Sequence, residues 1–299
     1  MKVIIAGGSG FVGKALSDYF LKNGDDVYIL SRQQKTNTNV KYIEWLNDYS
    51  KPEPFIEGAD IFINLAGESI NSGRWNKNRK SRILQSRLKA TTELLSLIGR
   101  LNVKPKVLIN ASAIGYYGTS NTAIFTEESN SIGDDFLSKT VKQWESLAMK
   151  AEALGVRTVL CRFGIVLDKK GGALPKMALP YQLYAGGKLG KGNQWISWIH
   201  IEDVVHAINF VIHNESVTGP VNFISPNPVQ MNEFGKILSQ VLGRPHWIPT
   251  PETALKLLLG EMSILMLEGQ KVLPRKLLEN GFTFLFPTLE IALKNIYQK

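Results

Sequence analysis

Residues 2–13 read Lys-Val-Ile-Ile-Ala-Gly-Gly-Ser-Gly-Phe-Val-Gly, and this stretch decides the fold class. A short β-branched run, Lys2–Ala6, passes directly into the glycine-rich segment Gly7–Gly13. Apolar residues then recur at helical spacing until Asn23-Gly24, and Val27–Leu30 is again apolar. The pattern predicts a strand, a tight turn, a helix and a second strand.

The glycines of this turn have the spacing GxxGxxG. The first permits the tight turn, the second lets a diphosphate approach the backbone, and the third lets the helix pack closely on the strand. The helix N-terminus points its free N–H groups at the anion. A turn without a ligand is the alternative, but the βαβ context favours a dinucleotide site. The predicted contacts are Gly7, Ser9, Gly10, Phe11, Val12 and Gly13.

The end of the second predicted strand indicates which dinucleotide binds. It reads Leu30-Ser31-Arg32, and no acidic residue lies between Ser31 and Thr38. An acidic residue there usually binds the ribose of NAD, whereas an arginine accommodates a 2′-phosphate. Ser31 and Arg32 therefore predict NADP(H), and an uninvolved surface arginine is the alternative.

Strands and helices continue to alternate up to about residue 167. Apolar runs at 59–65, 106–111 and 156–167 predict buried strands, and helical patterns cover 77–101 and 136–154. Strands that are apolar on both faces indicate a doubly wound parallel sheet between helices, an α/β fold. We therefore predict a nucleotide-binding domain over residues 1–167.

Beyond residue 167, glycines and prolines divide the chain into shorter pieces. Residues 168–299 are expected to form a smaller, mainly helical substrate lobe, with the segment 195–225 returning to the main sheet through a strand at 221–224. The helices expected there cover 201–213, 231–242, 251–268 and 287–297.

Composition narrows the class of protein. The 299 residues are 44% apolar and 20% charged, so disorder is excluded as the main state. One cysteine, Cys161, and four scattered histidines give no disulfide and no metal motif. No stretch is long and apolar enough for a membrane span, and the short N-terminal apolar run does not fit a signal peptide. We expect a cytoplasmic protein without a metal or a membrane partner.

The net charge of +9 raises the question of nucleic-acid binding. Nucleic-acid binders usually concentrate charge in a stripe, and here the basic residues are spread out, so no nucleic-acid partner is expected. One local cluster is predicted to be either a solvated helix face or an anion site, and it comprises Arg74, Lys77, Arg79, Lys80, Arg82 and Arg87.

Several longer strings carry a family resemblance over almost the whole chain. They include Asn-Leu-Ala-Gly-Glu-Ser-Ile at 64–70, Ala-Ser-Ala-Ile-Gly-Tyr-Tyr-Gly at 111–118, Gly-Asp-Asp-Phe-Leu at 133–137 and Glu-Gly-Gln-Lys-Val-Leu-Pro at 268–274. Together they resemble the atypical extended short-chain dehydrogenase/reductases, namely the epimerase family proteins of the SDR39U type. The resemblance implies an NADP-binding Rossmann fold.

The resemblance also implies roles for individual residues. The 2′-phosphate pair falls on Ser31 and Arg32, and a cofactor-contacting arginine matches Arg87, on the helix that follows the third strand, where Arg82 is also placed to reach the diphosphate. The loop on the adenosine side of the cofactor falls on Leu65, Ala66 and Gly67.

Typical members of the superfamily move a proton with Ser, Tyr and Lys, the last two arranged as YxxxK. Ser112 falls where the serine belongs, but residues 134–140 contain no tyrosine. Aligning Asp135 with the tyrosine keeps Lys139 as the lysine, and aligning Phe136 loses both. Tyr116 and Tyr117, which follow the fourth strand, are the alternative hydroxyls, with loop packing equally compatible.

Three aromatic side chains in QWISWIHIED are the candidates for substrate contact. They are Trp195, Trp198 and His200, for which packing between the lobes or a structural hydrogen bond is the alternative. The glycines at 171–172 and 186–190 are candidates for a lid.

The sequence thus favours an NADP(H)-dependent oxidoreductase or epimerase that acts on a small polar substrate, of which a nucleotide sugar is one candidate. The missing tyrosine keeps open a different class of protein, an NADP(H)-binding redox sensor or regulator without turnover. A homodimer is compatible with either interpretation.

Overall fold

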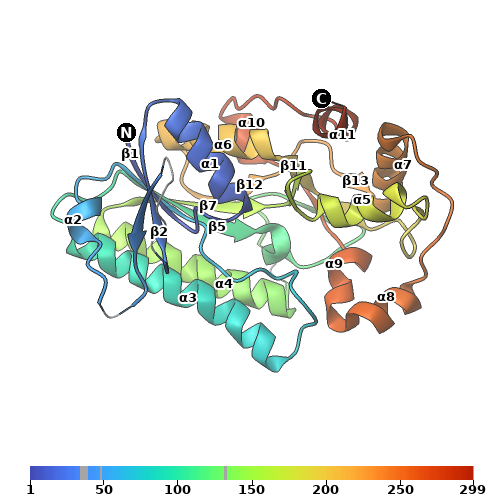
Figure 1. Ribbon diagram of the computed structural model, residues 1–299, viewed down its shortest axis with the longest axis horizontal. Coiled ribbons are helices and arrows are strands. Elements are labelled where there is room, and N and C mark those ends of the chain that lie inside the picture. The colour runs from blue at the N-terminus through green and yellow to red at the C-terminus, as the bar shows by residue number, and fades with distance from the viewer. Residues whose placement is uncertain (34–39, 48, 131–132, 299) are drawn as a thin grey trace.

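The computed structural model describes residues 1–33, 40–47, 49–130 and 133–298. Its centre is a seven-stranded sheet in which all neighbouring strands are parallel, in the order β12-β7-β5-β4-β1-β2-β3 (Figure 1). The predicted parallel α/β fold is confirmed. The strands are β1 (Lys2–Ala6), β2 (Asp26–Ser31), β3 (Lys41–Glu44), β4 (Ile61–Asn64), β5 (Val107–Ala113), β7 (Arg157–Phe163) and β12 (Gly219–Phe223).

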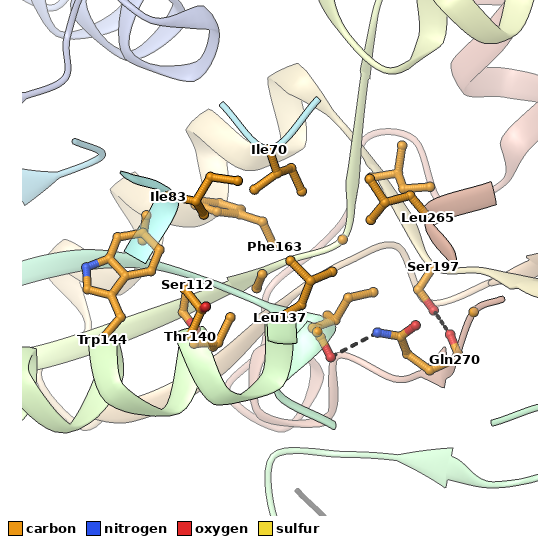
Figure 2. A pocket seen from close by; sticks show the side chains of 18 of the residues that line it. Ile70, Ile83, Ser112, Leu137, Thr140, Trp144, Phe163, Ser197, Leu265 and Gln270 are labelled. Carbon is orange, nitrogen blue, oxygen red and sulfur yellow. Dashed lines mark hydrogen bonds between the residues drawn. The ribbon is translucent and has the colours of Figure 1, made fainter. Parts of the chain in front are cut away.

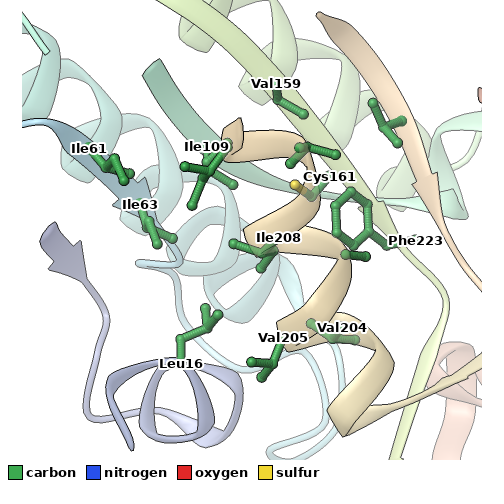
Figure 3. Packing of buried hydrophobic residues seen from close by; sticks show 14 of the residues in the cluster. Leu16, Ile61, Ile63, Ile109, Val159, Cys161, Val204, Val205, Ile208 and Phe223 are labelled. Carbon is green, nitrogen blue, oxygen red and sulfur yellow. The ribbon is translucent and has the colours of Figure 1, made fainter. Parts of the chain in front are cut away.

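Helices cover both faces of this sheet because its strands are apolar on both sides. On one face α1 (Phe11–Lys22) and α6 (Ile201–His213) pack on the strands, and Figure 3 shows Leu16 and Ile208 facing Ile63 and Ile109. The other face is covered by α3 (Lys77–Arg100) and α4 (Phe136–Ala148), which pack against each other, and the short η2 (Met149–Leu154) follows α4. The short α2 (Glu53–Ile56) precedes β4.

A buried polar cluster joins the carboxyl ends of two strands to the helices above them. The Asn64 side-chain amide donates to Thr91 Oγ1 over 2.9 Å and to Asn110 Oδ1 over 2.7 Å. The Trp144 indole N–H also donates to Thr91 Oγ1, over 2.9 Å. Because each of these groups has a partner, their burial costs little, and the cluster fixes how α3 and α4 lie on the sheet.

The apolar run predicted as one strand at 156–167 is two strands that belong to different sheets. The chain bends at Gly164, where β7 ends, and β8 (Ile165–Asp168) continues into a small sheet with β9 (Gly171–Gly172) and β11 (Trp198–His200). A Cβ atom on Gly164 would lie 2.4 Å from the Ser197 carbonyl oxygen. This close approach is how the chain passes from the main sheet into the C-terminal part.

The C-terminal part has its own apolar core, built largely from α5 (Leu174–Gln182), α7 (Met231–Leu242) and α11 (Leu289–Tyr297). The helix predicted over 251–268 is wrong as a single element, because Gly260 adopts a φ of +59° and separates α8 (Glu252–Leu259) from η3 (Gly260–Ser263) and α9 (Ile264–Leu267). The remaining elements are η1 (Ile114–Tyr117), β6 (Ile124–Phe125), β10 (Trp195–Ile196), β13 (Val229–Gln230), β14 (Lys271–Val272) and α10 (Arg275–Glu279).

The expected return of the chain to the main sheet occurs through α6 and β12, which pairs with β7 in parallel. None of the helices described by the structure has both the length and the hydropathy of a membrane span.

Because the chain is closely packed at the Gly164 bend, adding a single methyl group there should clearly destabilise the protein. Gly164→Ala should lower the free energy of unfolding by about 1–3 kcal/mol, because the new Cβ meets backbone rather than a movable side chain. Urea denaturation followed by circular dichroism measures the change. Gly99→Ala is the matched control, because Gly99 lies in α3 with no atom near its missing Cβ, so alanine should stabilise the protein by up to about 1 kcal/mol. Equal midpoints for the two variants would contradict the close approach.

Candidate functional site

A cavity of about 490 Å³ opens at the carboxyl ends of β1, β4 and β5, where ligands bind in parallel α/β sheets. Its walls come from the glycine turn, from α3 and α4, and from C-terminal segments that include β10 and α9 (Figure 2). We call this cavity the cleft. Residues from both parts of the chain therefore meet around one space.

The glycine turn forms one end of the cleft. Gly7 has a φ of +80°, and a Cβ there would lie 2.7 Å from the Leu65 carbonyl carbon. A Cβ on Gly13 would lie 2.6 Å from the Gly7 carbonyl oxygen, so the start of α1 is pressed against the turn. Gly10 differs, because a Cβ would meet only the Gly7 carbonyl oxygen, at 3.2 Å, and otherwise enter the cleft.

The N-terminus of α1 also faces this end. Gly10 is its N-cap and provides no side-chain hydrogen bond, so the first-turn N–H groups are available to an anion. Phe11, Val12 and Gly13 line the cleft, whereas Ser9 is exposed beside it.

Ser31 and Arg32 lie next to the turn, since Ala6 and Leu30 are partners in the β1–β2 pairing. Ser31 Oγ accepts a hydrogen bond from the Gln33 amide, and Arg32 is exposed. Residues 34–39, which include part of the segment expected to lack acidic residues, lie outside the described part of the chain.

Of the residues that follow β4, Leu65 lines the cleft, and Ala66 and Gly67 continue the loop beside it. Arg87 on α3 reaches the cleft under this loop and donates from Nη1 to the carbonyl oxygens of Glu68 (3.0 Å) and Ile83 (2.9 Å). Burial lowers the pKa of Arg87 to about 10, so the guanidinium is still charged at neutral pH. A charged, half-hidden guanidinium beside the glycine turn suits a phosphate.

The rest of the basic cluster is not directed into the cleft. Arg82 is exposed and lies 3.7 Å from Glu68, and Arg79 is buried in contact with the same carboxylate. Arg74 donates to the carbonyl oxygens of Leu257 (2.7 Å) and Leu258 (2.9 Å) in α8, and Lys80 pairs with Glu261. The cluster largely joins α3 and its preceding loop to the C-terminal part.

Ser112 lines the cleft at the end of β5 but is tied to a buried ion pair. Its hydroxyl donates to Glu145 on α4, and Arg162 on β7 holds the same carboxylate through two hydrogen bonds of 2.8 Å. Burial alone would lower the pKa of Arg162, but the bonds to Glu145 outweigh it and raise that pKa. Sequence reasoning missed this pair, because its members are distant in the chain.

The structure does not bring Tyr116 and Tyr117 to the cleft wall. The Tyr117 hydroxyl donates to Asn222 Oδ1 (2.8 Å) and accepts from Arg162 (2.9 Å), and burial raises the pKa of this phenol. The Tyr116 ring stacks on the Arg162 guanidinium, 3.6 Å from its carbon to the ring centre. Both rings pack around the ion pair, so neither geometry suits a proton donor at the cleft.

Helix α4 presents an apolar side to the cleft. The Asp135 carboxylate caps the helix by accepting from the amides of Leu137 (2.7 Å) and Ser138 (3.0 Å). This start turns Leu137, Thr140, Val141 and Trp144 toward the cleft, with Asp135 at its edge. Lys139 points to solvent and pairs with Asp134 at 2.7 Å, so the structure does not bring it to the cleft.

Of the three aromatic candidates, Trp195 lines the cleft and the other two do not. Trp198 is fully buried and donates to the Asn227 carbonyl oxygen over 3.1 Å. His200 caps α6 by accepting from the Glu202 amide over 3.1 Å, and its ring packs on Phe286. Neither the glycines at 171–172 nor those at 186–190 belong to the cleft wall. Within the described residues no group of His, Cys, Asp and Glu is arranged to hold a metal.

The part of the cleft wall that contains Ser197 and Gln270 was not predicted. Ser197 Oγ donates to the Gln270 carbonyl oxygen over 2.8 Å, and the Gln270 amide donates to the Ile114 carbonyl oxygen over 3.0 Å, as Figure 2 shows. Ile264 and Leu265 of α9 complete this wall. A local signal exists in the string 268–274, but its place beside the cleft depends on the whole fold.

Comparisons with known proteins agree with this geometry. The profile of the NAD dependent epimerase/dehydratase family matches residues 3–223, and a domain of unknown function, DUF1731, matches residues 250–296. Epimerase family protein YfhF of Bacillus subtilis is 46% identical over 99% of this chain and 98% of its own length. Epimerase family protein SSP1921 of Staphylococcus saprophyticus is 44% identical, with 98% of both chains covered.

Solved structures are similar over the full chain. Human epimerase family protein SDR39U1, crystallised with NADPH, has a TM-score of 0.90 and 34% identity, with both chains covered completely. A nucleoside-diphosphate sugar epimerase from Corynebacterium glutamicum has a TM-score of 0.80 and 30% identity, over 99% of this chain and 58% of that one. MoeE5, solved with UDP-glucose and NAD, shares the fold at 17% identity and a TM-score of 0.79.

The buried Glu145–Arg162 ion pair predicts that loss of its carboxylate destabilises the protein more than loss of an exposed, paired carboxylate. Glu145→Gln should lower the free energy of unfolding by about 3 kcal/mol, because Arg162 is left buried without a counter-charge. Glu290→Gln removes an exposed carboxylate paired with Lys294 and should change stability by no more than about 0.5 kcal/mol. Guanidinium denaturation of both variants makes the comparison. Similar losses of unfolding free energy in the two variants would show that the Glu145–Arg162 pair stabilises the protein no more than an exposed pair does.

Proposed function

The chain belongs to the NAD dependent epimerase/dehydratase family, and from this membership we propose that it binds NADP(H) in the cleft and acts as an oxidoreductase or epimerase on a small molecule. The observation that carries the proposal is the continuity of the cleft, which runs from the glycine turn past Arg87 to Ser112. A dinucleotide bound at one end would extend toward the hydroxyl at the other.

The residues at the glycine turn fit a dinucleotide. The space in front of Gly10 would be filled by a side chain, and the N-terminus of α1 supplies N–H donors without a protein cap. Arg87 adds a positive charge beside the loop that follows β4, and Leu65, Ala66 and Gly67 would flank the adenosine side. The human relative crystallised with NADPH supports this assignment.

The preference for NADP(H) rests on Ser31 and Arg32. Both lie beside the turn through the β1–β2 register, and Arg32 is exposed and therefore available to a 2′-phosphate. The serine hydroxyl would add one hydrogen bond to the same group.

The chemistry proposed is hydride transfer. When bound, NADPH would supply a hydride for the reduction of a carbonyl carbon, and the carbonyl oxygen would take a proton from solvent. Ser112 is the proposed hydroxyl beside that oxygen. To donate to the oxygen, its O–H would turn away from Glu145, to which it donates in this structure, and solvent would supply the proton that completes the reduction. The reverse transfer, followed by return of the hydride to the other face, would give epimerisation.

One observation favours the second class, a cofactor-binding regulator without turnover. Two pairs of residues on α4 line the cleft with a spacing of four: Leu137 with Val141, and Thr140 with Trp144. The superfamily places a tyrosine and a lysine at such a spacing, and no phenol or ammonium group faces the cleft from this helix. A protein partner that binds with only one redox form of the cofactor would favour this alternative.

Removal of the Arg32 guanidinium tests the cofactor preference. Arg32→Ala should weaken NADPH binding by about ten- to a hundredfold, because one charged hydrogen bond contributes about 1.5–3 kcal/mol, and should leave NADH binding almost unchanged. Isothermal titration calorimetry with both cofactors measures the difference. Lys22→Ala, at the far end of α1, is the control for a general loss of positive charge. An equal loss for both cofactors would argue against a 2′-phosphate contact.

A side chain at Gly10 tests the position of the diphosphate. Gly10→Val should abolish binding of NADPH and NADH alike, since its methyl groups would occupy the space between the backbone and the cleft. Gly10→Ala, which adds only the Cβ, should weaken binding less. Fluorescence of bound NADPH measures affinity, and thermal melts establish that both variants are folded. Unchanged affinity in folded Gly10→Val would mean that the turn is only structural.

A further inference from the structure

The walls of the cleft are mainly apolar. They carry Ile70, Leu137 and Phe163 from the nucleotide-binding part, Ile165 from β8, and Ile264 and Leu265 from α9. Figure 2 labels Ile70, Leu137, Phe163 and Leu265 among them. We call these six residues the apolar wall. Side chains of this kind stabilise a ligand by removing its apolar surface from water.

The polar groups along the same surface are already engaged with one another. Ser197 Oγ donates to the Gln270 carbonyl oxygen and accepts from the Val272 amide over 3.1 Å. Thr119 Oγ1 donates to Glu268 over 2.6 Å. A polyhydroxylated ligand would therefore have to compete with bonds inside the protein, which reduces its net gain.

The charges around this region are unfavourable for a diphosphate. Among the described residues that line the cleft, the acidic and basic side chains are Arg87, Asp135 and Glu268. Arg87 lies on α3, beside the loop that the proposed function assigns to the cofactor. A second cavity adjoins the cleft at Glu268 and has the acidic residues Glu252 and Glu261 in its wall. Its cations are Lys191 and Lys256, and Lys256 lies 3.7 Å from Glu252. A diphosphate placed in either space would face more carboxylates than cations in the wall.

We infer that the substrate is an uncharged, mainly apolar carbonyl compound or the corresponding alcohol, not a nucleotide sugar. This inference rests on the proposed function and replaces the polar substrate expected from the sequence. The carbon chain would lie on the apolar wall, with the carbonyl group directed to Ser112. Reduction converts one carbonyl compound, one NADPH and one proton from solvent into the alcohol and NADP⁺.

A series of methyl ketones from butanone to nonanone provides the test. Each methylene buried on the apolar wall should tighten binding by about fourfold, until the space is filled. Affinity is measured from the fluorescence of Trp195 and the other indoles, on the protein alone and with saturating NADPH. UDP-glucose serves as the competing probe and should not displace the ketones. The oxidation of NADPH is followed with the same series.

Leu265→Asn provides the matched variant, because it keeps the size of the side chain while removing its apolar character. In this variant, the gain in ketone affinity for each added methylene should fall to about half of the wild-type value, and the affinity for NADPH should be unchanged. Leu257→Asn, on the exposed face of α8, is the control and should behave as wild type.

The outcomes separate the two proposals. Failure of NADPH to bind, together with a chain-length dependence for the ketones, would overturn the proposed function and retain the apolar substrate site. Binding of NADPH without any chain-length dependence, or with tighter binding of UDP-glucose than of nonanone, would overturn this inference and retain the proposed function. If NADPH does not bind and ketone affinity does not depend on chain length, the proposed function and this inference are both overturned.

Discussion

The close approach of Gly7 to the peptide that joins Leu65 and Ala66 is the constraint on which the site depends. These segments follow neighbouring parallel strands, β1 and β4, and a Cβ on Gly7 would lie 2.7 Å from the Leu65 carbonyl carbon. Only glycine allows both this contact and the φ of +80° that turns the chain into α1. As a result the N-terminus of α1 and the loop after β4 meet at one end of the cleft. These two segments form that end without a further helix or strand.

The parts of this arrangement that depend on local spacing were predictable from the sequence. Three glycines at intervals of three residues, between a β-branched run and an apolar helix, predict the βαβ unit, and the buried strands follow from their continuous apolar runs. The division of residues 156–167 into β7 and β8 was not predictable in this way. An apolar run has the same appearance whether it belongs to one sheet or two, and the close approach at Gly164 involves Ser197, more than thirty residues further along the chain.

The position of the Tyr117 side chain shows why the site was harder to predict from the sequence than the fold. Its position after β5 is compatible with a reacting hydroxyl, and Ser112, with a similar position, does line the cleft. The Tyr117 phenol instead turns inward, because Arg162 on β7 and Asn222 on β12 offer it two hydrogen bonds. Arg162 is held there by Glu145 on α4. Three elements that are distant in sequence decide one side-chain direction, and a single sequence without an aligned family carries no signal for that.

The same ion pair also bears on the apolar side that α4 presents to the cleft. Asp135 caps α4 and sets its rotation, so that Glu145 points down to Arg162 and Ser112, while Leu137 and Val141 point into the cleft. A shift of one residue would bring Lys139 nearer the cleft, but it would also move Glu145 away from a buried guanidinium, at a cost of several kcal/mol. Of the basic cluster, Arg87 lines the cleft, whereas Arg74 and Lys80 contact the C-terminal part. The apolar substrate that we propose therefore follows from how the helices that line the cleft are anchored.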